Sequence, residues 1–483
     1  MKKFISVILI VCAISFCVTL SACNKDEGKT TLYNITCTYE DETGTLSGIM
    51  NVDYYNNTNT EISDLKFNLY GNAFRDGAQY SPVSDTYKNR AYYAGESYGK
   101  MEITNVENCA GWTVAGEDEN ILTVNLLTPI YPEDNTVLTV YYTLTLAKVN
   151  HRTGITANAV NLGNFYPVLC GRNTEGFVEC NYYYCGDPFY SECANYSVTI
   201  DMPEKYTCAS SGKLTDETCV NGRKRCSYAL NGARDFAMVL SEKFEVVSET
   251  VNGTEVSYYY VTDATPQNSL AAACESLKYF SETFGKYAYP TLSVVQTGFC
   301  YGGMEYPALT MIAEGLDADN NIYTIVHENA HQWWYAMVGN DQMNDAWQDE
   351  GLAEYSTLMF FESHPNYGFT RKGMINSATS YYRAFFTVFS QLNDVADTRM
   401  HRHLSEYKSE LEYNNITYNK GMILFDMLRT SLGDDKFVSG LQKYFSDNCG
   451  KIASADELIG CFIKSGVDVE GLFNSFLDGK ILI

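Results

Sequence analysis

The segment His327-Glu328-Asn329-Ala330-His331 constrains this chain more than any other feature of its sequence. Residues four apart lie one turn above each other on a helix, so His327 and His331 can direct imidazole nitrogens at one ion. Glu328 is rotated off that face and stays free to handle a proton. The spacing therefore predicts a helix that carries part of a metal site.

A catalytic zinc ion takes three protein ligands and keeps a fourth position open, and two histidines with one carboxylate are a known set. Glu350, in the stretch 347–355, is the candidate third ligand. Apolar residues between Tyr323 and Val338 indicate that the motif helix is buried, and buried imidazoles need partners that a metal supplies. A polar helix with two solvated histidines is the alternative. We predict one zinc ion per chain, bound by His327, His331 and Glu350.

The chain contains four motifs in the order Gly302-Gly303-Met304-Glu305, HENAHQWW at 327–334, Trp-x-x-Glu-Gly-x-Ala with Glu350 after eighteen intervening residues from His331, and Tyr418-Asn419-Lys420-Gly421. Together they resemble the alanyl aminopeptidase (aminopeptidase N-like) family of gluzincin zinc metallopeptidases. The resemblance extends from about residue 35 to the end of the chain.

The resemblance implies an α+β multidomain fold, in which an N-terminal, saddle-like β-sheet domain precedes a thermolysin-like α+β zinc catalytic domain. Segments such as Gly186 to Tyr190 resemble the N-terminal sheet domain of the family. Larger family members continue into a helical domain that covers the cleft. This chain stops before it, so we expect no C-terminal helical domain and a more open active site.

The chemistry of the motif assigns Glu328 as the general base for a zinc-activated water. The resemblance assigns Tyr418 to stabilising the oxyanion and Glu305 to binding the α-amine of a peptide. Gly302 and Gly303 have no side-chain bulk, so a peptide backbone can pair with their strand.

The amine site departs from the family pattern at one position, because Tyr306 follows Glu305 where the family has Asn. A second acidic or amide residue from the N-terminal sheet is not identifiable. Residues 157–167 offer Asn158, Asn161 and Asn164 but no carboxylate.

Two carboxylates are candidates to support a ligand histidine through its free N–H. Glu354 lies one helical turn after Glu350, where two bare carboxylates would repel each other. Asp345 is the second candidate.

The start of the chain predicts export and lipidation. A basic lead at 1–3 and an apolar run from Phe4 to Leu20 end in Leu20-Ser21-Ala22-Cys23. We expect residues 1–22 to be a lipoprotein signal peptide, Cys23 to be acylated, and residues 23–34 to be a tether. This places the protein on the outside of the cytoplasmic membrane. A single transmembrane anchor is the competing interpretation, since the run of ~17 residues is nearly long enough to span a bilayer.

The remaining chain divides by pattern. Residues 35–247 show short β-rich runs separated by turns, for example at 48–52, 65–69, 122–126, 137–144 and 196–200. After Val247, helical spacing from Gln267 to Phe284 and a strand from Leu292 to Phe299 begin the catalytic domain, at 248–483. Residues 375–475 are expected to be mainly helical.

The net charge bears on possible binding partners, and the cysteines bear on possible disulfide bonds. A net charge of −25 argues against nucleic acid. Seven cysteines lie between residues 170 and 226, where export would permit disulfides and buried free thiols are the alternative.

The sequence as a whole predicts a lipid-anchored, extracytoplasmic zinc aminopeptidase that removes N-terminal residues from peptides. A zinc endopeptidase with the same site is the second interpretation. A non-catalytic surface binding lipoprotein on a peptidase scaffold is the third.

Overall fold

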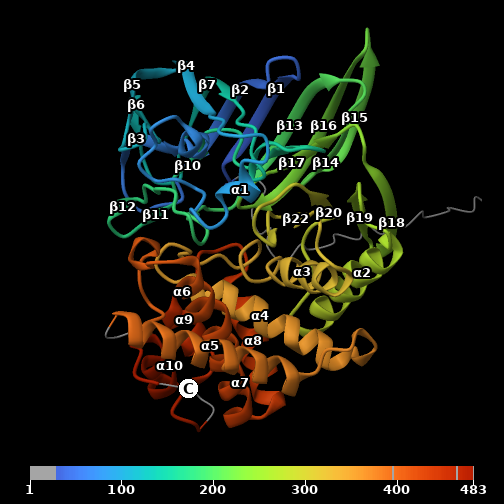
Figure 1. The fold of residues 1–483 in the computed structure, drawn as a ribbon. Helices are drawn as coiled ribbons and strands as arrows, with labels where there is room; N and C mark the ends of the chain where they lie inside the picture. The colour runs from blue at the N-terminus through green and yellow to red at the C-terminus, as the bar shows by residue number, and fades with distance from the viewer. Residues whose placement is uncertain (1–28, 394–395, 464–465, 482–483) are drawn as a thin grey trace, which may run out of the picture.

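The computed structural model describes residues 29–393, 396–463 and 466–481. The expected signal peptide at 1–22 and the lipidation site Cys23 lie outside these ranges. The described chain has a strand-rich N-terminal region and a helix-rich C-terminal region, which lie above and below one another in Figure 1.

The largest element of the N-terminal region is a seven-stranded sheet in the order β15-β16-β13-β1-β2-β7-β4. Buried and exposed residues alternate along β1 and β2, so one face of the sheet is packed. Strand β1 pairs in parallel with β13, and the other neighbours are antiparallel. The strands are β1 (Leu32–Glu40), β2 (Thr45–Tyr55), β4 (Lys100–Glu107), β7 (Asn135–Thr145), β13 (Ala194–Pro203), β15 (Lys213–Val220) and β16 (Arg223–Ala233).

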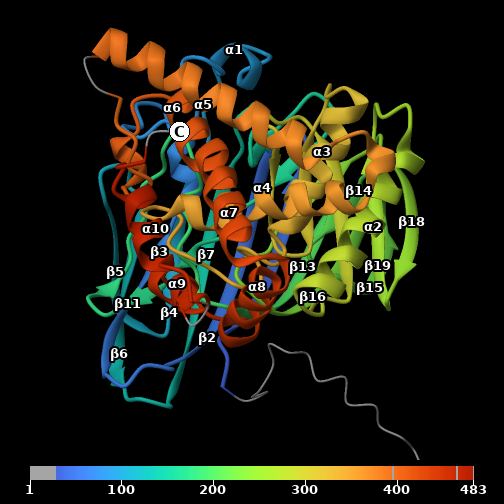
Figure 2. The same ribbon diagram turned by 90° about the horizontal axis from the view of Figure 1, so that it is seen from below.

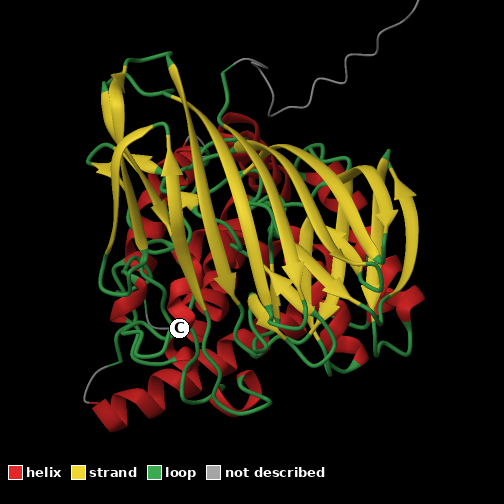
Figure 3. Ribbon diagram, turned by 90° about the horizontal axis from the view of Figure 1, so that it is seen from above, coloured by secondary structure: helices red, strands yellow, loops and turns green. Residues whose placement is uncertain are grey.

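Three smaller sheets complete this region, in the orders β10-β3-β6-β5, β14-β17-β9-β8 and β11-β12. Seen from above, the strands form a broad layer that covers the helices (Figure 3). The elements are β3 (Ile62–Asn68), α1 (Lys88–Ala91), β5 (Cys109–Ala115), β6 (Ile121–Ile130), β8 (Thr153–Ile155), β9 (Val160–Leu162), β10 (Val168–Leu169), β11 (Arg172–Asn173), β12 (Gly176–Phe177), β14 (Thr207–Ser210) and β17 (Met238–Ser241).

The C-terminal region begins with a five-stranded sheet in the order β18-β19-β20-β22-β21. Strand β21 is at its edge and pairs antiparallel with β22. The strands are β18 (Glu245–Val251), β19 (Thr254–Tyr260), β20 (Thr291–Thr297), β21 (Gly303–Met304) and β22 (Leu309–Ala313).

Helices make up most of the rest, and Figure 2 shows α5, α7, α8 and α10 on the side away from the large sheet. Helix α3 packs against α2 and α4, and α4 packs against α7. The helices are α2 (Pro266–Thr283), α3 (Ala318–Ala330), α4 (Ala346–Ser363), α5 (Arg371–Asn393), α6 (Glu410–Asn414), α7 (Lys420–Leu432), α8 (Asp434–Asn448), α9 (Ala455–Gly460) and α10 (Val469–Leu477).

The expected two-part α+β fold and the expected strands are present. Strand β1 takes up residues 32–34 of the expected tether, and β18 begins at Glu245, shortly before the expected boundary at 247. The seven cysteines between 170 and 226 are free thiols. None of the helices in the described ranges is both long and apolar enough to cross a membrane.

The motif helix is shorter than its apolar pattern indicates. Helix α3 ends at Ala330, whereas the buried pattern continues to Val338. Beyond His331 the backbone forms wider turns, in which Ala336 N–H donates to His331 O and Val338 N–H donates to Trp333 O. Tyr335 has a φ of +148°, which a helix cannot include. Burial, and not helical structure, accounts for the apolar residues after His331.

Candidate active site

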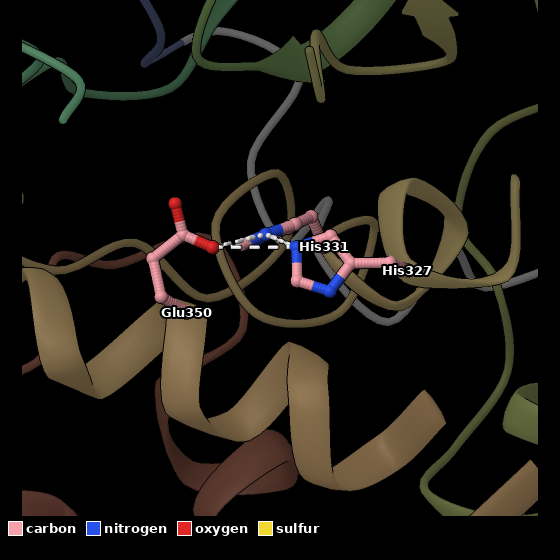
Figure 4. A group of neighbouring side chains, drawn as sticks. All are labelled: His327, His331 and Glu350. Carbon is pink, nitrogen blue, oxygen red and sulfur yellow. Dashed lines mark hydrogen bonds and ion pairs between the residues drawn. The ribbon is translucent and has the colours of Figure 1, made fainter. Parts of the chain in front are cut away.

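The predicted metal ligands come together at the junction of α3 and α4 (Figure 4). His327 lies in the last turn of α3, His331 caps its end, and Glu350 lies on α4. The two Nε2 atoms are 3.1 Å apart, and Glu350 Oε2 lies 3.1 Å from His331 Nε2 and 3.3 Å from His327 Nε2. All three side chains are buried.

This donor set fits a zinc ion. The His331 Nδ1–H donates to Trp334 O at 3.0 Å, which leaves the Nε2 lone pair directed at the cluster. Three electron-rich atoms that converge within 3.3 Å in a buried place need a cation to offset their desolvation. Two imidazoles and one carboxylate are a zinc set, and they leave a further position open.

Glu328 points from the motif helix toward the edge strand β21. Its Oε2 is buried and has no hydrogen-bond partner. A β carbon on Gly303 would collide with its carboxylate, so the side chain of Glu328 packs directly against the Gly303 backbone. Burial raises the pKa of Glu328 to about 7. A carboxylate held beside the metal position, with one free oxygen, can take a proton from water there.

Tyr418 reaches the same place from a π-helical turn, Asn415–Asn419, that leads into α7. Its hydroxyl donates to Glu350 Oε1, and its ring stacks on that of His327 at 5.9 Å between centroids. Burial raises the pKa of Tyr418 well above its usual value, so the hydroxyl keeps its proton. It is therefore a hydrogen-bond donor beside the metal position.

Glu305 follows β21 and is 4% exposed. It accepts a hydrogen bond from Gln342 Nε2 at 3.2 Å, and the same amide donates to Asp349 at 2.7 Å. Burial and then the neighbouring Asp187 raise the pKa of Glu305 well above its usual value. No cation among the described side chains is paired with it, so a cationic group would stabilise its charge.

Of the two carboxylates expected to support a ligand histidine, only Glu354 lies at the site. Its Oε1 is 3.9 Å from His327 Nδ1, and its Oε2 accepts from the Tyr323 hydroxyl. Asp345 does not contact a ligand, because its Oδ1 accepts from Trp347 Nε1 and pairs with His401 Nδ1. The partner of His331 is instead the carbonyl of Trp334.

A cavity of about 440 Å³ opens in front of these residues and is lined by both regions of the chain. Gly302, Gly303, Glu305, the three ligands and Tyr418 all line it, together with Glu354. The N-terminal region contributes Arg152 and Asp187, which form a buried ion pair.

Asp187 is a site residue that the sequence analysis missed. It lines the cavity and lies close enough to Glu305 to influence its pKa. The three asparagines considered for this role are used elsewhere: Asn158 donates to Glu314, Asn161 to carbonyls of His151 and Gly298, and Asn164 to Asp235. The Gly186-Asp187-Pro188 turn was the available signal, but nothing local indicates that it faces the zinc motif.

Tyr306, which stands where the family has Asn, does not line the cavity. Its side chain is fully buried, and its hydroxyl donates to Asn164 Oδ1 at 2.7 Å. It therefore joins the segment after β21 to the N-terminal region.

The chain is similar in sequence to known aminopeptidases. The chain is 24% identical over 294 residues to endoplasmic reticulum aminopeptidase 2 of Homo sapiens, which covers 55% of this chain and 29% of that protein. It is 23% identical over 306 residues to aminopeptidase N of Haemonchus contortus, covering 58% of this chain and 30% of that protein. The chain thus spans less than a third of the length of either relative.

The fold matches solved structures over nearly its whole length. The M1 zinc metallopeptidase of Deinococcus radiodurans superposes with a TM-score of 0.67 at 18% identity, covering 94% of this chain and 95% of that one. A variant of that protein was solved with a Tyr-Ser-Ala substrate. Residues 268–476 match the Peptidase family M1 domain. This domain match, the two-part fold and the converging group of His327, His331 and Glu350 support an alanyl aminopeptidase-like gluzincin zinc metallopeptidase.

Proposed function

We propose that this protein is a zinc aminopeptidase that hydrolyses the N-terminal peptide bond of peptides. The observation that carries the proposal is the placement of Glu305 and Asp187 in the same cavity as His327, His331 and Glu350. Carboxylates beside a metal position suit a substrate whose charged amine lies next to its scissile bond. The Tyr-Ser-Ala complex of the Deinococcus radiodurans relative supports peptides as the substrate class.

His327, His331 and Glu350 would hold the zinc ion, which supplies Lewis acidity and activates water when bound. Glu328 takes a proton from the attacking water and passes it to the leaving amine. The Tyr418 hydroxyl, now donating to Glu350, is placed to donate to the oxyanion that forms at the carbonyl.

Glu305 and Asp187 set the position of the peptide along the cleft. Glu305 binds the α-ammonium group, and Asp187, held in place by Arg152, adds negative charge on the N-terminal side. The Gly302-Gly303 backbone lies along the cavity wall, where an extended peptide can pair with it. Binding the free amine fixes which bond reaches Glu328.

The protein is also proposed to be a lipoprotein outside the cytoplasmic membrane. The support is the sequence of residues 1–23, in which a basic lead and an apolar run end at Cys23. Two acyl chains would give stable attachment.

The test compares peptides that differ only at the amine. We expect hydrolysis of alanyl and leucyl fluorogenic substrates and none of their N-acetylated forms, with activity lost to a chelator and restored by zinc. Glu328→Gln should lower kcat by roughly 10²–10⁴-fold, because general-base assistance is lost, while metal analysis finds zinc retained.

The controls separate the alternatives. Equal cleavage of acetylated peptides would establish an endopeptidase and overturn the amine-binding role. Absence of stoichiometric zinc in the purified protein would support a non-catalytic binding protein.

A further inference from the structure

One carboxylate of the cavity has no task in the proposed reaction. Glu410 begins helix α6, is half-buried, and lines the cavity. Its Oε1 accepts a hydrogen bond from Ser84 Oγ at 2.7 Å, and the Tyr301 hydroxyl lies beside it. Among the residues that the structure describes, none forms a salt bridge with Glu410.

The other charges of the cavity are already compensated. Glu350 belongs to the metal set, Asp187 is paired with Arg152, and Glu354 lies 3.9 Å from His327 Nδ1 and accepts from Tyr323. Glu328 is held for proton transfer, and Glu305 faces the amine of the peptide. Of the six carboxylates that line the cavity, Glu410 is the one with only hydroxyl partners. Among the described residues it has no cationic partner, and it has no role in the proposed reaction.

The wall around Glu410 is aromatic. Tyr87, Tyr184 and Tyr301 line the cavity near it, and the rings of Tyr87 and Tyr301 pack edge to face at 5.2 Å. The electron-rich faces of aromatic rings attract cations, and their bodies bury the apolar stem of a long side chain. A carboxylate at the end of such a wall suits a long side chain with a positive tip.

The segment Tyr184 to Asp187 connects this wall with the amine site. At one end, Asp187 lies near Glu305. At the other, Tyr184 and Cys185 lie near enough to Glu410 for its charge to raise their pKa values. Tyr301 directly precedes Gly302 and Gly303, along which the peptide would run. A side chain on the residue anchored at Glu305 therefore has a continuous wall that leads to Glu410.

We propose that Glu410, with the Tyr87, Tyr184 and Tyr301 wall, forms a subsite for an N-terminal arginine or lysine side chain. This inference rests on the proposed aminopeptidase function and names its preferred substrate class. It requires no change in the hydrolytic step. The basic side chain donates to the carboxylate of Glu410, while its α-ammonium group stays at Glu305.

The test uses pairs of aminoacyl-coumarin substrates of closely similar length that differ in charge. We expect arginyl to exceed citrullinyl, and lysyl to exceed norleucyl, by roughly 10-fold in kcat/KM, which is the factor that one charge-assisted hydrogen bond supplies. Glu410→Gln should remove most of this ratio and leave citrullinyl and alanyl hydrolysis unchanged. Glu249→Gln, an exposed residue of β18 outside the cavity, is the matched control and should keep the wild-type ratio.

Each outcome bears on one of the two proposals. Hydrolysis of alanyl substrate with equal rates for arginyl and citrullinyl would overturn the subsite alone, and so would an unchanged ratio in Glu410→Gln. Failure to hydrolyse any free aminoacyl substrate would overturn the proposed function itself. Arginine amide should inhibit alanyl hydrolysis by the wild type more strongly than citrulline amide, a measurement that does not depend on the folding of a variant.

Discussion

Gly303 shows how one missing side chain positions a reactive group. The carboxylate of Glu328 occupies the space that a β carbon at Gly303 would need, whereas a β carbon at Gly302 would meet nothing within 4 Å. Both glycines line the cavity. From the sequence, the two residues are equivalent positions without side-chain bulk. In the structure, only Gly303 leaves room for the Glu328 carboxylate.

The pair therefore offers a matched comparison. Gly303→Ala is expected to displace Glu328 and to lower kcat for alanyl substrate by roughly 10²-fold, the cost of a misplacement of about 1 Å at a reacting centre. Gly302→Ala should leave kcat near the wild-type value, because its methyl group enters open space. Zinc content and the thermal midpoint, measured for both variants, verify that the fold and metal site persist. Equal losses of kcat would contradict this role of Gly303.

At the scale of elements, the end of α3 is shaped by a residue from the other region of the chain. Arg234 directly follows β16 and is 2% exposed. Its guanidinium donates to carbonyls of Tyr335 at 2.8 Å and Ser191 at 2.9 Å, and also to those of Met337 and Lys451. It thus supplies hydrogen bonds to backbone carbonyls in the turn after the zinc motif, where the hydrogen bonds of helix α3 have ended.

Arg234→Lys tests this connection. The ammonium group cannot reproduce the planar fork, so buried carbonyls lose partners and the free energy of unfolding should fall by about 2 kcal/mol. Arg225→Lys changes an exposed residue of β16, the strand that precedes Arg234, and should have an effect within about 0.5 kcal/mol. Denaturant unfolding measures both variants. If Arg234→Lys lowered the free energy of unfolding no more than Arg225→Lys does, the turn would not depend on the guanidinium group of Arg234.

At the scale of the whole molecule, the cavity belongs to neither region alone. The metal ligands and Tyr418 come from the catalytic helices, whereas Arg152, Asp187 and Tyr184 come from the N-terminal region. Tyr306 and Arg234 bond across the same boundary. The relative position of the two regions therefore determines the amine site and the Glu410 subsite together.

The proposed attachment of this molecule to a membrane has its own test. Cys23→Ser in the full-length protein should move activity from the membrane fraction to the soluble fraction, because no acyl chains can be added. Cys219→Ser, which alters an exposed free thiol of β15, should leave the activity in the membrane fraction. If Cys23→Ser remained in the membrane fraction, residues 4–20 would be a spanning anchor and the lipoprotein proposal would be wrong.

The sequence by itself determined the local chemistry. His327 and His331 face one ion because helical geometry fixes residues four apart, and the strands follow the alternation of apolar residues. The extent of α3 could not be predicted this way, since the apolar residues after His331 are buried in turns and burial alone leaves the same pattern.

Only the tertiary structure decided which distant residues share the cavity. Asp187 and Glu410 carry no motif, and Asp345, close to Glu350 in sequence, bonds away from the site to Trp347 and His401. The physical reason is that periodicity reports which face of an element is buried, whereas the packing of one region on the other selects the side chains that meet there. Spacing therefore predicted the zinc ligands, and packing determined the surroundings that we propose bind the substrate.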